Sequence, residues 1–452
     1  MPTTPPAALL VLLAVLAAPP AAAQTAVPLA PCTLYDMGGV AQAGPPLDRP
    51  APAERRGGAA TVVRTEGGAA AFEVTYTGFT PQAQAAFQAA VDVWAEHLAS
   101  PVPVRIDARF EALGPGVLGS AGPFIVADPP GAPARNTFYP SALANALAGR
   151  DLDAASADIE ARFNSDFDRF SFALDGTVPA GRYDFATVVL HELGHGLGFF
   201  GSGRVDDGDG DAECAAGTAG VGCWGYRAAL ADLPLVFDRS VEDRAGRPFL
   251  NPAVYPNPSR ALGALLQSGD LYVNAPTVVA VSGGTRPEVW APEPAEVGSS
   301  FSHWDEVAFG AGTPNALMTP RIGTGEAYRD PGSLTCAFFQ DMGWRLGAGC
   351  TRLTGGGSVA AAAPPAPPAL VAAGPNPFRG ATAVDLQVPT AQRVSAVLVD
   401  ALGRPVRTVH DGAVGAGRIR IRVDADGLPA GAYWLRVETE AGGAGLPLVH
   451  VR

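Results

Sequence analysis

The stretch His191-Glu192-Leu193-Gly194-His195 decides what kind of protein this chain can be. On an α-helix, residues four positions apart lie on the same face, so both imidazoles can reach a single metal ion. Neutral imidazole nitrogen suits zinc, and Glu192 projects beside His191, near the open coordination position of the metal. The stretch therefore predicts a zinc site on a helix, with Glu192 as its general base.

The residues around this stretch predict an α/β layer. Asp184 is a candidate N-cap, and the helix is expected over residues 185–197. An alternating strand at residues 72–79 leads into an amphipathic helix at about residues 82–98. Further strands are expected at residues 102–110, 123–127 and 158–163. This order of strand, helix, strands and helix is typical of a sheet with helices packed against it.

Two histidines hold zinc poorly, so a third protein ligand is needed. The chain has four other histidines: His97, His303, His410 and His450. His97 falls in the first predicted helix, where a surface or core histidine is the ordinary interpretation, and His410 and His450 fall in a separate C-terminal region. His303 is then the best candidate. A downstream carboxylate, such as Glu213 or Glu242, is the alternative.

Residues 191–198, HELGHGLG, are similar to the metzincin pattern of zinc proteases, in which a glycine turns the chain after the second histidine. The common version has its third ligand three residues after that glycine, and here this position is Gly201, which cannot ligate. The leishmanolysin-like branch places the third histidine after a long insertion, and His303 fits that position. Residues 315–320, NALMTP, resemble the Met-turn beneath the zinc of this family, with Met318 as its methionine.

The resemblance implies an α/β zincin domain over residues 70–353, with a twisted mixed sheet, an active-site helix, a Met-turn and an insertion at about residues 202–300. It implies a secreted zinc endopeptidase that acts on proteins or peptides. Glu192 would accept the proton of a water that the zinc activates and return it to the leaving amine. A non-catalytic zincin-like protein that binds a partner at the cell surface is the alternative from another functional class.

A dense carboxylate loop lies inside the insertion. Asp207, Asp209 and Asp211 have the D-x-D-x-D spacing of a calcium-binding loop. The loop departs from an EF-hand, because Ala212 replaces the expected glycine and Thr218 replaces the terminal glutamate. A calcium site is one interpretation, and a solvated acidic turn is the other.

The five cysteines permit disulfides if the protein is exported. Cys214 and Cys223 are close enough in sequence for a local bridge, and Cys336 and Cys350 flank the end of a helix expected at residues 333–344. Cys32 is then left over. It pairs with one of the later cysteines, or its thiolate caps the metal in a latent form.

The ends of the chain differ from its centre in composition. Residues 1–23 are typical of a signal peptide, and residues 24–69 are expected to be an N-terminal extension or removable prosegment. Residues 354–374 are a Pro/Ala/Gly stretch without charge, which predicts a linker. Short alternating runs in residues 375–452 predict a small all-β sandwich.

Three motifs in this last region, PNPF at 375–378, DALGR at 400–404 and LPAGAY at 428–433, resemble the C-terminal sorting domain of the bacterial type IX secretion system. The resemblance implies that the type IX machinery carries the protein across the outer membrane. The protein would then be released or attached to the cell surface.

Charge and hydropathy exclude two classes of partner. The 452 residues carry a formal net charge of −13, and all of their basic residues are Arg. This acidic balance argues against a nucleic-acid partner, which normally requires clustered positive charge. After the N-terminal signal, no stretch is apolar over the 18 or so residues that a membrane-spanning helix needs, so no transmembrane segment is expected in the mature chain.

Overall fold

The computed structural model describes residues 27–28, 32–36, 40–44, 60–63, 70–208, 214, 217–228, 231–355, 369–388, 392–400, 404–414, 417–439 and 442–451. The predicted signal peptide lies outside these residues.

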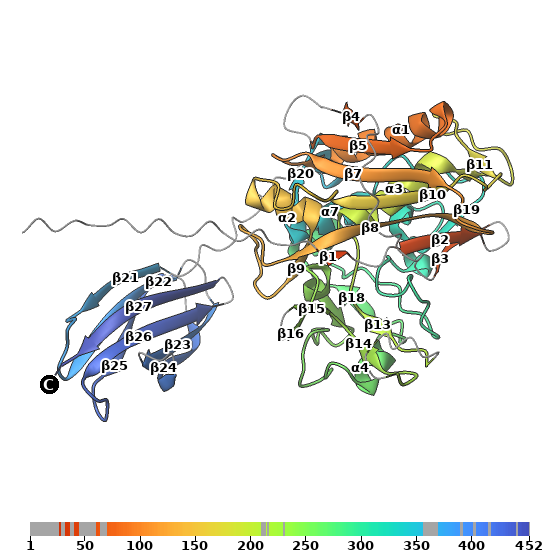
Figure 1. Cartoon of the computed structure of the whole chain (residues 1–452). Helices are drawn as coiled ribbons and strands as arrows, with labels where there is room; N and C mark the ends of the chain where they lie inside the picture. The colour runs from red at the N-terminus through yellow and green to blue at the C-terminus, as the bar shows by residue number, and fades with distance from the viewer. Residues whose placement is uncertain are drawn as a thin grey trace, which may run out of the picture.

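A mixed β-sheet organises the larger part of the molecule (Figure 1). Strands β5 (Phe72–Thr77), β7 (Val104–Glu111) and β10 (Ile159–Asn164) run parallel, and β8 (Val117–Ala127) pairs antiparallel with β10. Buried and half-buried residues alternate along β7, as a strand with one face on the core requires. The strands predicted ahead of the helix that carries His191 and His195 are therefore confirmed, although β8 begins six residues before the predicted start.

Two capped helices pack against this sheet and against each other. Helix α1 (Pro81–His97) begins after Thr80, whose hydroxyl accepts a hydrogen bond from the Ala83 N–H at 3.2 Å. Helix α3 (Phe185–Leu197) has the predicted bounds and the predicted N-cap, Asp184. Every residue of α3 is buried, so the histidine-bearing helix is a core element covered on all sides.

The two ends of α3 are held by side chains from the C-terminal part of the domain. At the N-terminal end, Asp184 accepts from the Thr187 N–H at 2.8 Å and forms a bidentate ion pair with Arg329. At the C-terminal end, the indole N–H of Trp344 donates to the carbonyl of Leu197 at 3.0 Å. The indole of Trp94 in α1 donates to the carbonyl of Leu190 in the middle of the helix. These contacts fix the position of α3 along its axis.

Part of the predicted N-terminal extension, residues 24–69, pairs with the main sheet. Strands from residues 24–69 join the main sheet: β1 (Val27–Pro28), β2 (Cys32–Asp36), β3 (Val40–Gly44) and β4 (Ala60–Val63). The sheet order is β19-β3-β2-β8-β10-β7-β5-β4, with β1 and β9 (Phe138–Pro140) also paired to β8. Main-chain pairing brings these strands into the sheet, and their composition did not predict it.

The remaining elements before the insertion are short. They are β6 (Leu98–Ala99), α2 (Ser141–Ala148), β11 (Phe170–Ser171) and β12 (Tyr183–Asp184). After the insertion come α6 (Glu306–Phe309), η2 (Ala316–Met318), β19 (Arg321–Gly323), α7 (Ser333–Met342), β20 (Arg345–Leu346) and α8 (Ala348–Leu353). A disulfide between Cys336 and Cys350 joins α7 to α8. Helix α7 confirms the helix predicted at residues 333–344, although it ends at Met342.

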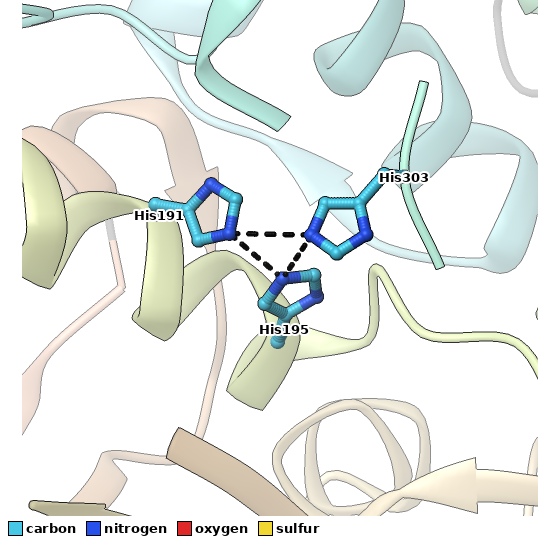
Figure 2. Close-up of side chains that lie close together, drawn as sticks. All are labelled: His191, His195 and His303. Carbon is cyan, nitrogen blue, oxygen red and sulfur yellow. Dashed lines mark hydrogen bonds between the residues drawn. The ribbon is translucent and has the colours of Figure 1, made fainter. Parts of the chain in front are cut away.

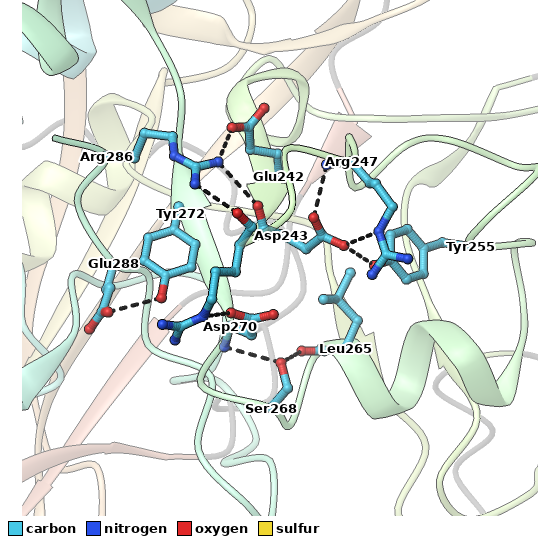
Figure 3. Close-up of polar contacts among 11 residues, drawn as sticks. Glu242, Asp243, Arg247, Tyr255, Leu265, Ser268, Asp270, Tyr272, Arg286 and Glu288 are labelled. Atoms are coloured by element: carbon cyan, nitrogen blue, oxygen red, sulfur yellow. Dashed lines mark hydrogen bonds and ion pairs between the residues drawn. The ribbon is translucent and has the colours of Figure 1, made fainter. Parts of the chain in front are cut away.

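The insertion is a compact arrangement of short elements. These are β13 (Arg204–Val205), β14 (Gly222–Cys223), β15 (Tyr226–Ala228), β16 (Ala231–Leu233), η1 (Phe237–Ser240), β17 (Val241–Asp243), α4 (Arg260–Leu265), β18 (Leu271–Val273) and α5 (Pro276–Val281). The predicted Cys214–Cys223 disulfide is present. Polar contacts surround the β17–β18 pair, where Arg286 contacts both Glu242 and the ring of Tyr272 (Figure 3). Arg244 also lies over the Tyr272 ring.

The C-terminal region is all β, with a hydrophobic core of its own. One sheet has the order β21-β22-β25 and the other β24-β23-β26-β27. The strands are β21 (Ala369–Gly374), β22 (Ala381–Val388), β23 (Gln392–Asp400), β24 (Pro405–Val414), β25 (Gly417–Asp424), β26 (Gly431–Thr439) and β27 (Gly442–His450). The predicted linker at residues 354–374 is therefore too long, because its last six residues form β21 and pair with β22.

None of the helices in the described part of the chain combines the length and the apolar character needed to cross a membrane.

Candidate metal centre

Three histidine side chains meet at one point in the core (Figure 2). His191 and His195 come from α3, and His303 comes from the segment after the insertion. Their Nε2 atoms lie 3.0 Å (His191 to His195), 3.1 Å (His195 to His303) and 3.3 Å (His191 to His303) apart. All three side chains are fully buried. The structure thus brings the three predicted metal ligands together.

Main-chain carbonyls fix the tautomer of each imidazole. The Nδ1–H groups of His191, His195 and His303 each donate a hydrogen bond to a carbonyl oxygen at 2.6–2.7 Å. The accepting carbonyls belong, in the same order, to Leu317, Phe199 and Ser299. With the proton held on Nδ1, the lone pair of each Nε2 points toward the other two. Three lone pairs that face one another repel unless a cation lies between them.

The distances fit a tetrahedral zinc ion. Zinc–nitrogen bonds of about 2.0–2.1 Å in tetrahedral geometry place two ligand nitrogens about 3.3 Å apart. The observed separations of 3.0–3.3 Å are close to this value. Three neutral imidazoles form a donor set that suits zinc, and they leave a fourth position for water or substrate.

Burial keeps the imidazoles neutral. It lowers the pKa of His191 to about 4 and the pKa of His303 to about 3. Burial, together with the neighbouring His191 and His303, lowers the pKa of His195 well below its usual value. A histidine must be neutral to donate its lone pair, so the cluster is in the ligating form throughout the neutral pH range.

Glu192 lies beside the cluster on α3 and is fully buried. Its Oε2 accepts a hydrogen bond from the main-chain N–H of Ala121 in β8 at 2.8 Å. Its Oε1 has no hydrogen-bond partner among the described residues. Burial raises the pKa of this carboxyl well above its usual value, and the Ala121 N–H opposes that shift. One oxygen is thus held by the sheet, and the other is available to a ligand.

Met318 packs directly beneath the helix at Gly194. A Cβ atom added to Gly194 would lie 2.6 Å from the Met318 sulfur and 3.3 Å from the Trp94 ring. The 2.6 Å contact is too short, so the absence of a side chain at Gly194 lets Met318 pack against α3 at this position. Met318 itself is fully buried, and the carbonyl next to it in sequence, that of Leu317, orients His191.

Gly201 lies where the segment after the insertion packs against the chain that follows α3. A Cβ on Gly201 would collide with the backbone and ring of Phe301, two residues before His303. The Gly201 N–H also donates to the Ser302 hydroxyl at 3.3 Å. Gly201 is the position compared above with the third ligand of the common metzincin pattern. Here its lack of a side chain lets the segment that carries His303 pack closely against the end of α3.

The other candidate ligands do not join the cluster. Glu242 is half-buried in the insertion and paired with Arg286, and Glu213 lies outside the described residues. His97 is buried against the end of α1, where its Nδ1–H donates to the Val93 carbonyl. His410 and His450 lie in the C-terminal β region, in β24 and β27.

The predictions for calcium and for Cys32 remain predictions. Asp207 is exposed, whereas Asp209 and Asp211 fall outside the part of the chain that the structure describes. The backbone of Cys32 lies in β2, but its side chain is outside the described atoms.

The groups that the sequence did not predict are main-chain atoms. The carbonyls of Leu317, Phe199 and Ser299 orient the imidazoles, and the Ala121 N–H holds Glu192. Every residue type carries these atoms, so composition and spacing give no signal for them. Only the fold brings them to the site.

No protein-family model and no curated protein matches the sequence of this chain.

Replacing His303 tests the third ligand. We expect His303→Ala to lose zinc to a chelator that leaves the parent chain loaded, because only two imidazoles would remain. Glu242→Gln is the matched control for the carboxylate alternative and should retain zinc as the parent does. Zinc content after dialysis against graded chelator measures both. Unchanged zinc affinity in His303→Ala would contradict the three-histidine site.

Replacing Gly194 tests the packing beneath the site. We expect Gly194→Ala to displace Met318, to lower stability by about 1–3 kcal/mol and to weaken zinc binding about 10- to 100-fold. Gly380→Ala is the control, because no atom lies within 4 Å of the added Cβ there. Denaturant unfolding and chelator competition provide the readouts. Equal behaviour of the two variants would rule out this role for Gly194.

Proposed function

We propose that this chain is a zinc-dependent endopeptidase of the metzincin type, with His191, His195 and His303 as zinc ligands and Glu192 as general base. The observation that carries the proposal is the Glu192 carboxylate, which lies next to a cluster of three neutral imidazoles with one oxygen anchored and the other without a described partner. A buried carboxyl in that position is costly unless it serves the site.

The three histidines and Glu192 have different roles in the proposed reaction. Zinc held by the three imidazoles would polarise a peptide carbonyl and lower the pKa of a bound water. Glu192 would take a proton from a water molecule on Oε1, while Ala121 keeps Oε2 in place. The oxygen of that water would bond to the peptide carbonyl carbon, and the C–N bond would then break. The same carboxyl would then deliver the proton to the leaving amine nitrogen, so that one residue acts first as base and then as acid.

The charge of a bound cation would also adjust the base. Burial alone favours the protonated form of Glu192. A positive charge a few ångströms away favours the carboxylate form. Glu192 would therefore have its proton affinity set by two opposing effects, which suits a group that must accept and then release a proton near neutral pH.

The surrounding architecture supports the same class. The zincin resemblance implies a mixed sheet, an active-site helix and a methionine beneath the site. The corresponding parts here are the parallel strands β5, β7 and β10, the antiparallel strand β8, helix α3 and Met318. A carboxylate third ligand is disfavoured because Glu242 is already engaged by Arg286. A non-catalytic binding role gives no reason for a buried Glu192 beside the histidines.

We further propose that the C-terminal β region carries the protein through type IX secretion to the medium or the cell surface. Its separate hydrophobic core and two sheets support a module that folds apart from the metal site. The three motifs that resemble the sorting domain lie within or between its strands.

Glu192→Gln tests the proposed reaction. Glutamine keeps the shape and the hydrogen bond from Ala121 but cannot accept a proton, so peptide hydrolysis should fall by roughly 10²- to 10⁴-fold while zinc is retained. Glu96→Gln, which removes an exposed ion pair with Arg352, is the control and should keep its activity. Cleavage of a fluorogenic peptide library measures the effect. Activity surviving in Glu192→Gln would defeat the mechanism.

Truncation tests the export role. In a host with a type IX system, the full chain should reach the medium or the outer surface. A chain that ends at residue 353 should stay in the periplasm, with its zinc bound. Cell fractionation and immunoblotting distinguish the two locations, and export of the truncated chain would contradict the proposal.

A further inference from the structure

His303 is the candidate ligand that α3 does not hold in place. His191 and His195 belong to one buried helix, whereas His303 lies 108 residues after His195 on a segment without regular structure. Its imidazole is oriented by the carbonyl of Ser299, to which the Nδ1–H group donates at 2.7 Å. The position of His303 therefore depends on whatever holds residues 299–303.

The backbone of this segment is strained at Phe301. Its φ angle of +66° lies in the left-handed region, which a residue with a bulky side chain rarely adopts. Such a conformation persists only where the surrounding contacts impose it. The Phe301 ring is fully buried, and its N–H donates to the carbonyl of Trp290 at 2.8 Å. The chain that leads into His303 is thus kept in a form that it would leave without support.

The main chain of Glu296 forms the turn that presents the Ser299 carbonyl. The Glu296 carbonyl accepts hydrogen bonds from the N–H groups of Ser299 at 3.0 Å and Ser300 at 2.9 Å. Its own N–H donates to the Ser300 hydroxyl at 2.9 Å. The orientation of the third imidazole therefore depends on the place of Glu296.

The side chain of Glu296 joins two other segments. Its Oε2 accepts from the indole N–H of Trp290 at 2.9 Å, and its Oε1 pairs with Nη2 of Arg321 at 3.3 Å. The guanidinium of Arg321 also lies over the Trp290 ring, 5.0 Å from its centroid. Only 24% of the Glu296 side chain and 31% of the Arg321 side chain are exposed, so water screens this pair less than a surface pair. We call Trp290, Glu296 and Arg321 the clamp.

The clamp reaches the chain on both sides of His303. On one side, the main-chain N–H of Trp290 donates to the His303 carbonyl at 2.9 Å. On the other side, Arg321 begins β19, three residues after Met318. The Met318 carbonyl accepts from the N–H of Trp304 at 2.9 Å. The clamp therefore connects the end of the insertion to the segment that follows the ligand.

We propose that the clamp positions the third metal ligand, because it keeps the strained turn at Phe301 in the form that directs His303 toward the other two histidines. Trp290, Glu296 and Arg321 are then positioning residues that act through the main chain around the ligand. The inference rests on the zinc site of the proposed function. Contacts behind a metal ligand commonly change metal affinity by about 10- to 100-fold.

Glu296→Ala in the full chain tests the clamp, because it removes both side-chain contacts of the turn. We expect zinc affinity, measured by chelator competition, to fall about 10- to 100-fold. We also expect a changed visible absorption spectrum in the cobalt(II)-substituted protein, since its bands depend on coordination geometry. Glu242→Ala is the matched control: it removes another half-buried pair in the insertion, with Arg286, and should change neither quantity.

Two milder variants extend the test. Glu296→Gln keeps an oxygen that can accept from the Trp290 indole, so its zinc affinity should return to within about threefold of the parent value. Trp290→Phe keeps a ring beneath Arg321 but removes the indole donor, and it should shift the cobalt spectrum in the same direction as Glu296→Ala.

The proposal is wrong if Glu296→Ala and Trp290→Phe are folded and show the zinc affinity and cobalt spectrum of the parent chain. If Glu296→Ala does not fold, Trp290→Phe alone decides the matter by the same two quantities. An equal effect of Glu242→Ala would also overturn the proposal, because the loss would then follow from stability alone.

The same variants separate this proposal from the proposed function. Weaker zinc binding in the clamp variants, with no cleavage of any library peptide by the zinc-loaded parent chain, would reject the peptidase and support the clamp. Cleavage by the parent chain, with unchanged zinc affinity in the clamp variants, would support the peptidase and reject the clamp.

Discussion

Three imidazole lone pairs directed at one point are the constraint on which the rest of this structure depends. Each ring is oriented by a carbonyl of the main chain, so the backbone near Leu317, Phe199 and Ser299 must be placed as accurately as the histidines themselves. This requirement explains why α3 is buried along its whole length. It also explains why tryptophans and an ion pair from distant segments hold the helix at its two ends and its middle.

His303 lies far along the chain from His195, and main-chain hydrogen bonds near His303 hold it in place. The Trp290 N–H donates to the His303 carbonyl, the Phe301 N–H donates to the Trp290 carbonyl, and the Trp304 N–H donates to the Met318 carbonyl. Inside the insertion, buried Asp238 accepts from the main-chain N–H groups of Ser202 and Leu235 and ties the start of the insertion to its middle. The segment that carries His303, the candidate ligand that is remote in sequence, is thus joined to Met318 by a main-chain hydrogen bond.

The pattern of residue types in the sequence predicted those parts of the structure that depend on side-chain contacts. Helix α3 and its cap Asp184 followed from the residue pattern, because helical geometry leaves a trace in residue types. His303, which the structure places with His191 and His195, followed from setting the other histidines aside and from the family resemblance. Strands β3 and β21 were missed because VAQAG and ALVAAG have no alternation of polar and apolar residues. Such strands join a sheet through main-chain hydrogen bonds alone. Every sequence carries the groups that form these bonds, so the residue types give no signal. The hydrogen bond from Ala121 to Glu192 escaped prediction for the same reason.

The glycines at positions 194 and 201 have a consequence for how such sites are found. The candidate ligands are three histidines, but their arrangement also depends on the absence of side chains at Gly194 and Gly201. A methyl group at either position would collide with Met318 or with Phe301. A search that matches only the histidines and the glutamate would accept chains whose bulkier residues cannot close the site. A search that also required glycine at both positions would test the shape of the site as well as its chemistry.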